Sequence, residues 1–163
     1  MKPLETYAAV VRMPFGAVGI RVAGDTLAGL DFLPPDWPEK PPENAPAANA
    51  ARQLRQYLAQ PDFRFDLPLA QAGTAFQRAV WREIATIPPG KSATYGQLAR
   101  RLDFAPRAVG QACGANPFPL ITPCHRVIAA NGGLGGFAGR GADAPFLQQV
   151  KRWLLQHEGV HLE

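Results

Sequence analysis

A cysteine and a histidine stand side by side at positions 124 and 125, within the pentapeptide Pro-Cys-His-Arg-Val of residues 123–127. The thiolate is the reactive form of cysteine, and a free thiol with a pKa near ~8.5 ionises little at neutral pH unless a base or a positive charge assists it. A neighbouring imidazole and a following arginine could give that help. The pattern therefore predicts that Cys124 is a nucleophile. The alternative is a buried, inert cysteine, which is the commoner role.

The composition limits which classes of protein this can be. At 163 residues and 47% hydrophobic, the chain can form one ordinary domain or two small ones with packed cores. The net charge of +4 permits a polyanionic partner without requiring one. Two cysteines without C-x2-C spacing and three scattered histidines predict neither a disulfide framework nor a metal site, and we expect no cofactor. With no long apolar run and no secretory leader, we expect a cytoplasmic protein with no membrane partner.

The elements that must position the Cys-His pair follow from the patterning, which predicts an α+β fold in two parts. Residues 1–70 are expected to form a small, variable α/β domain, with strands at the apolar runs 7–11, 18–22 and 27–33. The proline-rich stretch 34–46 is expected to be a loop, followed by a helix over 47–59 and a further short strand at 63–67.

Residues 71–163 are expected to form a mainly helical domain. Thr74 with Gln77, and Thr94 with Gln97, are spaced as capping boxes that open helices. A third helical segment, 106–115, begins with a proline, which suits the first helical turn. The second and third helices fit a helix-turn-helix, although any helical hairpin would give the same pattern.

The rest of this domain carries the Cys-His pair. Residues 120–124 are expected to run extended into it, with another extended piece at 127–129. A final helix over 144–157 is expected to have a buried stripe of five apolar residues, namely Phe146, Leu147, Val150, Trp153 and Leu154.

From residue 73 to residue 158 the chain resembles the O6-alkylguanine-DNA alkyltransferases. The matching pieces are, in order, G-T-A-F-Q-x-x-V-W at 73–81, I-P-x-G at 87–90, T-Y-G-Q-L-A at 94–99, R-A-V-G at 107–110, A-N-P at 115–117, P-C-H-R-V-I at 123–128 and L-L-x-H-E-G at 154–159. The resemblance covers about half the chain, and the first 70 residues match only loosely. It implies DNA repair by direct, irreversible and stoichiometric transfer of an alkyl group to the protein.

The resemblance also implies the catalytic roles. Cys124 matches the thiol that attacks the alkyl carbon on O6 of guanine, and His125 matches the base that draws the thiol proton through a water. Glu158 matches the carboxylate that orients the imidazole, in the general logic of a nucleophile, a base and an orienting acid. Asn116 matches the residue that ties the helix-turn-helix to the active-site strand. Tyr95 matches the phenol that donates to the departing guanine.

The partner implied by the resemblance is double-stranded DNA that carries O6-alkylguanine, bound by a monomer. Arg107 matches the arginine that enters the duplex where the target base has been flipped out. Tyr95, Gly96 and Gln77 fall where the family contacts DNA. Cys113 matches no functional position and is interpreted as a small core residue. Repair of O4-alkylthymine stays open.

Three departures from the family pattern stand near the site. Thr122 replaces a large aliphatic residue, Phe137 replaces the tyrosine of a G-Y-x-G loop, and the stretch 140–145 is longer than usual. Two other functions remain as alternatives. One is a DNA-binding protein without transfer activity, either a helix-turn-helix regulator or a lesion binder; the alkyltransferase-like lesion binders lack the acceptor cysteine that this chain has. The other is a Cys-His hydrolase, for which the sequence offers no oxyanion-hole signature.

Overall fold

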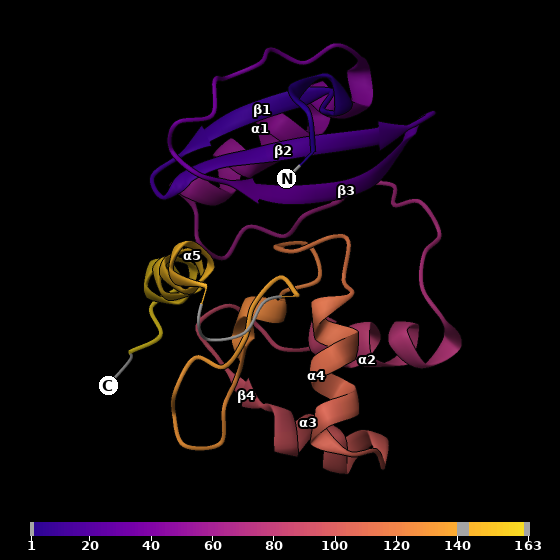
Figure 1. Ribbon diagram of the computed structural model, residues 1–163, viewed down its shortest axis with the longest axis vertical. Coiled ribbons are helices and arrows are strands. Elements are labelled where there is room, and N and C mark those ends of the chain that lie inside the picture. The colour runs from indigo at the N-terminus through magenta and orange to yellow at the C-terminus, as the bar shows by residue number, and fades with distance from the viewer. Residues whose placement is uncertain (1, 140–143, 162–163) are drawn as a thin grey trace. The chain divides into compact units, whose positions relative to one another are not determined.

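The computed structural model describes residues 2–139 and 144–161 and divides the chain into two compact units, residues 1–71 and 72–163. The first unit contains three strands and one long helix, and the second contains helices with a short two-stranded sheet (Figure 1). This mixture confirms the expected α+β class. No helix in the described part of the chain is both long and apolar enough to cross a membrane.

The first unit is an antiparallel sheet covered by a helix. After a short 3-10 turn, η1 (Leu4–Thr6), strands β1 (Ala9–Met13), β2 (Gly16–Ala23) and β3 (Thr26–Leu33) pair in chain order. Helix α1 (Ala45–Ala59) lies against one face of this sheet (Figure 1). The three strands, the loop and the helix were all predicted.

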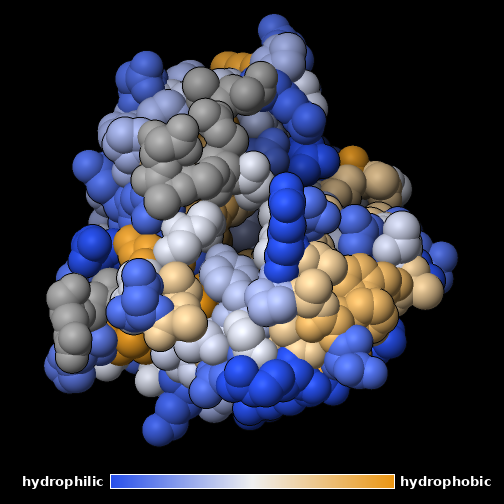
Figure 2. All heavy atoms as spheres, turned by 60° about the horizontal axis from the view of Figure 1, so that its bottom comes forward, coloured by the Kyte–Doolittle hydropathy of each residue, from blue (hydrophilic) through white to orange (hydrophobic). Residues whose placement is uncertain are grey.

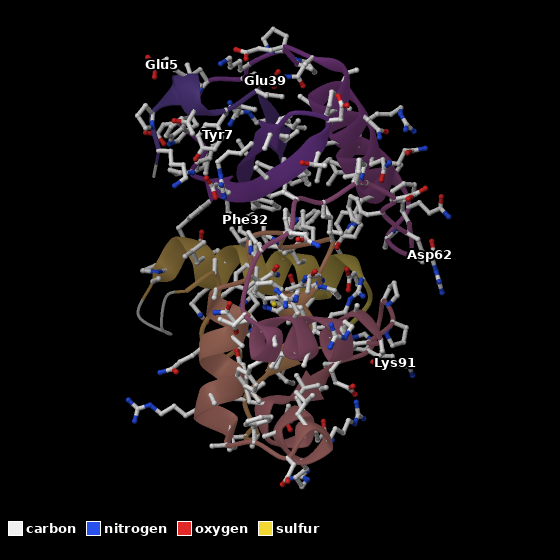
Figure 3. All side chains as sticks on the ribbon, turned by 90° about the vertical axis from the view of Figure 1, so that its right-hand side faces the viewer. Glu5, Tyr7, Phe32, Glu39, Asp62 and Lys91 are labelled. Atoms are coloured by element: carbon white, nitrogen blue, oxygen red, sulfur yellow. The ribbon has the colours of Figure 1, made fainter. Side chains whose placement is uncertain are left out.

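Close backbone approach shapes the core of this unit. A Cβ on Gly19 would lie 2.5 Å from a ring carbon of the fully buried Tyr7, so glycine lets the ring lie flat on β2. Figure 3 shows Tyr7 and Phe32 at the sheet and Asp62, beyond α1, pointing outward.

The prediction of a strand at 63–67 is wrong. That segment contributes aromatic packing instead, with Phe65 against Tyr57 at 5.6 Å between ring centroids.

Three helices form the framework of the second unit. Helix α2 (Ala75–Ala85) and helix α3 (Tyr95–Leu102) each begin with a complete capping box in which both reciprocal hydrogen bonds are made, as predicted. Helix α4 (Pro106–Gly114) has its proline in the first turn. Only three residues join α3 to α4, and Asp103 takes the left-handed conformation (φ 57°) that ends α3 sharply. These features give the helix-turn-helix that the sequence predicted.

The Cys-His pair lies in a turn and not at the end of an extended segment. Residues 124–126 form the 3-10 turn η2 (Cys124–Arg126), and Leu120 takes a positive φ of 77°. The expected extended run over 120–124 is therefore wrong, because the backbone folds into successive turns closed by bonds such as Arg126 N to Pro123 O at 3.0 Å. Strand β5 (Val127–Ile128) follows as expected and pairs in parallel with β4 (Ala93–Thr94).

Helix α5 (Pro145–His157) ends the fold, and its buried face differs from the prediction. The four buried residues are Val150, Lys151, Leu154 and Leu155. Trp153 is only half-buried and stacks on His157 at 4.6 Å. A lysine takes a core position here because backbone carbonyls surround its ammonium group, which hydrophobic periodicity alone does not detect. Most of the stretch 140–145, expected to be unusually long, lies outside the described residues.

Candidate functional site

A cavity of about 720 Å³ in the second unit brings together residues that are distant in sequence. Its walls come from α3, α4, the turn η2 and the glycine-containing loop of residues 136–139. Three of the predicted site residues line it, namely Tyr95, Arg107 and Cys124. Phe137 and Cys113 line it as well. The thiol, the phenol and the arginine thus face one space.

Asn116 holds the Cys124 thiol in place. Its side-chain nitrogen donates to the Thr122 carbonyl at 2.9 Å and to Cys124 Sγ at 3.2 Å, while its Oδ1 accepts from the Phe118 backbone at 2.9 Å. One amide side chain therefore joins the end of α4 to the turns that carry the cysteine. Thr122 accepts the Asn116 hydrogen bond through its backbone carbonyl. A threonine at the position where the family often has a large aliphatic side chain therefore leaves this hydrogen bond intact.

The two cysteines are neighbours. Cys113 is buried in the core of the second unit, as predicted from the sequence, and it also lies beside Cys124. The Cys124 thiol donates to the Cys113 backbone carbonyl oxygen, at 3.6 Å from Sγ. The neighbouring Cys113 side chain, and then burial, hold the pKa of the Cys124 thiol well above its ordinary value. The neighbouring Cys124 side chain lowers the pKa of Cys113. Without assistance, Cys124 is a protonated thiol at neutral pH.

His125 and Glu158 form the predicted base and carboxylate pair. His125 Nε2 lies 2.9 Å from Glu158 Oε2, and neither side chain has more than 1% exposure. A hydrogen on Nε2 that points to the carboxylate leaves Nδ1 with the lone pair, and within the described residues Nδ1 has no hydrogen-bond partner. Burial lowers the pKa of His125 more than the carboxylate raises it, so the imidazole is neutral and able to accept a proton at Nδ1.

Arg126 is a member of this cluster that the sequence did not reveal. Its guanidinium binds both oxygens of Glu158, at 2.8 Å from Nε to Oε1 and 3.0 Å from Nη2 to Oε2, and donates to the Ile87 carbonyl at 2.6 Å. Glu158 therefore serves two partners. The arginine balances the buried carboxylate charge, so the carboxylate can stay ionised beside a neutral histidine.

Lys151 is a second residue that sequence reasoning missed. Its fully buried side chain donates to the carbonyls of Val127, Leu134 and Gly136, and its ammonium lies 5.8 Å from the centre of the Phe137 ring. Burial lowers the pKa of Lys151 to about 8. The lysine fastens the loop beside the cavity to α5. A lysine inside the apolar stripe of the final helix is the signal that could have indicated this role.

Tyr95 is placed as a hydrogen-bond donor. Its hydroxyl donates to the Gly136 carbonyl at 3.2 Å and its ring is half-buried at the cavity wall. Burial, with the nearby thiols, raises the pKa of Tyr95 well above its ordinary value, so the phenol keeps its proton.

The predicted DNA-contacting residues lie on exposed or half-exposed parts of the second unit. Arg107 is exposed in the first turn of α4. Gln77 and Gly96 are half-buried at the starts of α2 and α3. Figure 2, in which the lower part of Figure 1 turns toward the viewer, shows hydrophilic side chains gathered around a smaller hydrophobic patch. Exposed arginines on these helices are Arg78, Arg82, Arg100 and Arg101.

Gly96 has no internal reason to be glycine. A Cβ there would meet its nearest neighbour, an Arg100 nitrogen, at 3.6 Å, which is an ordinary contact. Its backbone is helical, so alanine would fit and would favour the helix. A glycine that the fold does not require is typical of a place where another molecule approaches the backbone closely.

The described residues contain no group of three histidine, cysteine or carboxylate side chains arranged to hold a metal ion. The side chains at and beside the cavity offer nucleophilic chemistry, with a thiol, a neutral imidazole on an ionised carboxylate, and a protonated phenol. These are the parts needed to attack an electrophilic carbon and to stabilise the group that leaves it.

Comparison with known proteins agrees with this chemistry. A family model described as "6-O-methylguanine DNA methyltransferase, DNA binding domain" matches residues 75–160. A methylated-DNA–protein-cysteine methyltransferase of Methanosarcina acetivorans is 37% identical over 94% of this chain and 98% of its own length. One from Shigella flexneri is 48% identical over 68% of this chain, which is 62% of that protein.

Solved structures give the same assignment over both units. The crystal structure of Mycobacterium tuberculosis OGT in complex with DNA is 35% identical, has a TM-score of 0.75, and covers 91% of this chain and 90% of its own. An O6-methylguanine DNA methyltransferase from Methanococcus jannaschii is 28% identical with a TM-score of 0.63 over 94% and 95%. On these matches, the chain belongs to the 6-O-methylguanine DNA methyltransferase family.

Proposed function

We propose that this protein repairs DNA by moving a methyl group from O6 of guanine to the sulfur of Cys124. The observation that carries the proposal is the Cys124 thiol, held by Asn116 at the wall of a cavity and followed directly by His125 on Glu158. Relatives named for transfer to a protein cysteine support the reaction type. Single-turnover reaction with a duplex that contains one O6-methylguanine, followed by the mass of the whole protein, tests it.

The proposed step is an in-line displacement at the methyl carbon. His125 Nδ1 accepts the Cys124 proton through a bridging water, and the sulfur forms a bond to carbon as the carbon–O6 bond breaks. The electron pair stays on the guanine, where the Tyr95 phenol donates to the departing base. Because a thioether is not hydrolysed as an acyl-enzyme is, the product stays on the protein and each chain reacts once.

The pH dependence of the transfer rate should show whether His125 takes the proton from the Cys124 thiol or the thiol ionises alone. Cys124 has a raised pKa and His125 a lowered one, so transfer of a proton from the thiol to the imidazole changes no net charge. The single-turnover rate should therefore stay level from about pH 6.5 to 8 and fall only below the histidine's lowered pKa. A thiol that ionised alone would instead give a rate that rises about tenfold per pH unit through this range, and that result would remove His125 from the proton path.

Duplex DNA carrying O6-alkylguanine is the proposed partner, bound by a monomer whose helix α4 bears Arg107. A stacked base cannot present its O6 alkyl carbon to a buried thiol, so it must be flipped out of the helix at a cost of a few kcal/mol. A guanidinium that fills the vacated space offsets part of this cost. We place the protein in the cytoplasm, where a reduced thiol pool would keep Cys124 usable.

Arg107→Ala should impair repair of duplex DNA far more than transfer from free O6-benzylguanine, because only the paired base needs flipping. Arg107→Lys should recover little, since an ammonium cannot stack and bridge as a guanidinium does. The measurement is a pair of single-turnover rates, on methylated duplex and on free base. Arg55→Ala, which removes an exposed cation from α1 in the first unit, is the matched control. Equal losses on both substrates would assign Arg107 to the fold or the cavity and not to flipping.

Gly96→Ala should separate stability from DNA binding. Alanine inside a helix is favoured over glycine by about 0.5–1 kcal/mol, so the variant should unfold at equal or higher denaturant concentration. If DNA approaches the backbone here, the added methyl group should weaken duplex binding while the reaction with a free base stays unchanged. Urea unfolding and a fluorescence titration with duplex measure the two effects. Unaltered DNA affinity in the more stable variant would remove Gly96 from the interface.

A further inference from the structure

The Cys113 and Cys124 thiols lie at one cavity, and the proposed transfer reaction uses only Cys124. The residues are eleven positions apart, at the end of α4 and in η2, and ten residues of chain lie between them. Both are buried, with 8% and 6% exposure, and both line the same cavity. Cys124 Sγ lies 3.6 Å from the Cys113 backbone oxygen, and neither cysteine is in a disulfide.

We propose that this pair is a site of oxidative modification, in which a small hydroperoxide entering the cavity converts Cys113 and Cys124 to a reversible disulfide. Cys124 Sγ already lies 3.6 Å from the Cys113 backbone oxygen and both residues line one cavity, so rotation of the two side chains is the movement needed to form a sulfur–sulfur bond of about 2.05 Å. The cavity that admits a methylated base has ample room for hydrogen peroxide.

The steps balance with hydroperoxide as the oxidant. The Cys113 thiolate attacks the outer peroxide oxygen, the O–O bond breaks, and the leaving oxygen takes a proton to become water or an alcohol. Cys113 is then a sulfenic acid. The Cys124 sulfur attacks the Cys113 sulfur, and the hydroxide that leaves takes the Cys124 proton and departs as water. Two thiols lose two electrons in total, and the hydroperoxide gains them.

The charges around the two sulfurs support this order of attack. The neighbouring thiol and burial raise the pKa of Cys124, whereas the neighbouring thiol lowers the pKa of Cys113. The ammonium of Lys151 is close enough to both sulfurs to favour negative charge on them. Cys113 is thus the sulfur that ionises first in the free protein, and Cys124 is placed to resolve its oxidised form.

The disulfide would protect a protein in which each chain can accept only one alkyl group. A lone acceptor thiol exposed to peroxide would be driven toward sulfinic acid, which thiols do not reduce. A disulfide with Cys113 blocks transfer but can be reopened by a dithiol, so the acceptor is stored and not destroyed.

The test is the mass of the full chain after mild hydrogen peroxide treatment and denaturation in N-ethylmaleimide. We expect a product lighter by two hydrogens that carries no maleimide, and a peptide in which Cys113 is linked to Cys124. Transfer should be lost completely and return with dithiothreitol. Stepwise oxygen addition to Cys124 with Cys113 still maleimide-labelled, a disulfide-linked dimer, or two labelled thiols would each overturn the proposal. The mass reading does not depend on alkyl transfer, so it stands apart from the proposed function.

Two variants sharpen the result. Cys113→Ser keeps the size of the side chain and should give no internal cross-link. Cys124→Ser should accumulate the Cys113 sulfenic acid, which dimedone labels, because the resolving sulfur is missing. Absence of that label on Cys113 would overturn the order of attack. Wild-type protein already alkylated with iodoacetamide is a control that needs no substitution and should not lose two hydrogens.

Discussion

Cys124→Ala is expected to bind methylated duplex with unchanged affinity and to transfer no methyl group at all. The substitution removes the only atom that the proposed step bonds to carbon, and leaves the exposed arginines of α2, α3 and α4 in place. Asn116 keeps its other two hydrogen bonds, to Thr122 and Phe118, so the turn before the cysteine should survive. Fluorescence titration measures binding, and intact-protein mass measures transfer.

Cys113→Ser is the matched control for this loss. It alters the neighbouring thiol, in the same cavity and at similar burial, and reduced protein should still accept one methyl group. Methyl appearing on Cys113 in the Cys124→Ala protein, or on any residue other than Cys124 in the wild type, would contradict the assignment of the acceptor.

Glu158→Gln is expected to have the second largest effect and to act on both rate and stability. An amide cannot balance the His125 imidazolium that forms as the thiol proton moves, so transfer should slow by about 10²–10⁴-fold. The same change leaves the buried Arg126 guanidinium without its counterion, which should cost about 3–5 kcal/mol of unfolding free energy. Single-turnover rates and urea unfolding measure the two quantities.

Arg126→Gln separates the two roles of the carboxylate. It breaks the same buried ion pair, so its loss of stability should be similar. Glu158 still accepts the His125 Nε2 hydrogen, however, so the rate should fall much less. Equal rate losses in the two variants would mean that Glu158 supports the fold only. Glu158 would then have no role in moving the thiol proton.

The parts of this fold that the sequence predicted are those with local chemical signatures. The capping boxes at Thr94 and Thr74 fix where α3 and α2 begin because one side chain and one backbone group satisfy each other within four residues. Pro106 likewise marks the start of α4. The His125 and Glu158 pair came from resemblance alone, since the two residues are 33 positions apart.

The features that the sequence did not reveal depend on contacts between distant segments. Lys151 is buried because three carbonyls, one from β5 and two from the loop that follows it, converge on its ammonium group, and no periodicity in α5 contains that information. The ion pair between Arg126 and Glu158 likewise joins residues 32 positions apart, so no local pattern reveals it. The segment 63–67 has strand-like composition but contributes aromatic packing and not strand pairing.

The most direct test of the account is the stoichiometry of transfer. Limiting protein is incubated with excess duplex that contains O6-methylguanine, and the mass of the intact chain is compared with the amount of guanine restored. We expect one methyl group per chain, on the peptide that contains Cys124, and a reaction that stops when every chain carries it. Restoration of more guanine than there are protein chains, or restored DNA beside protein of unchanged mass, would contradict transfer to Cys124.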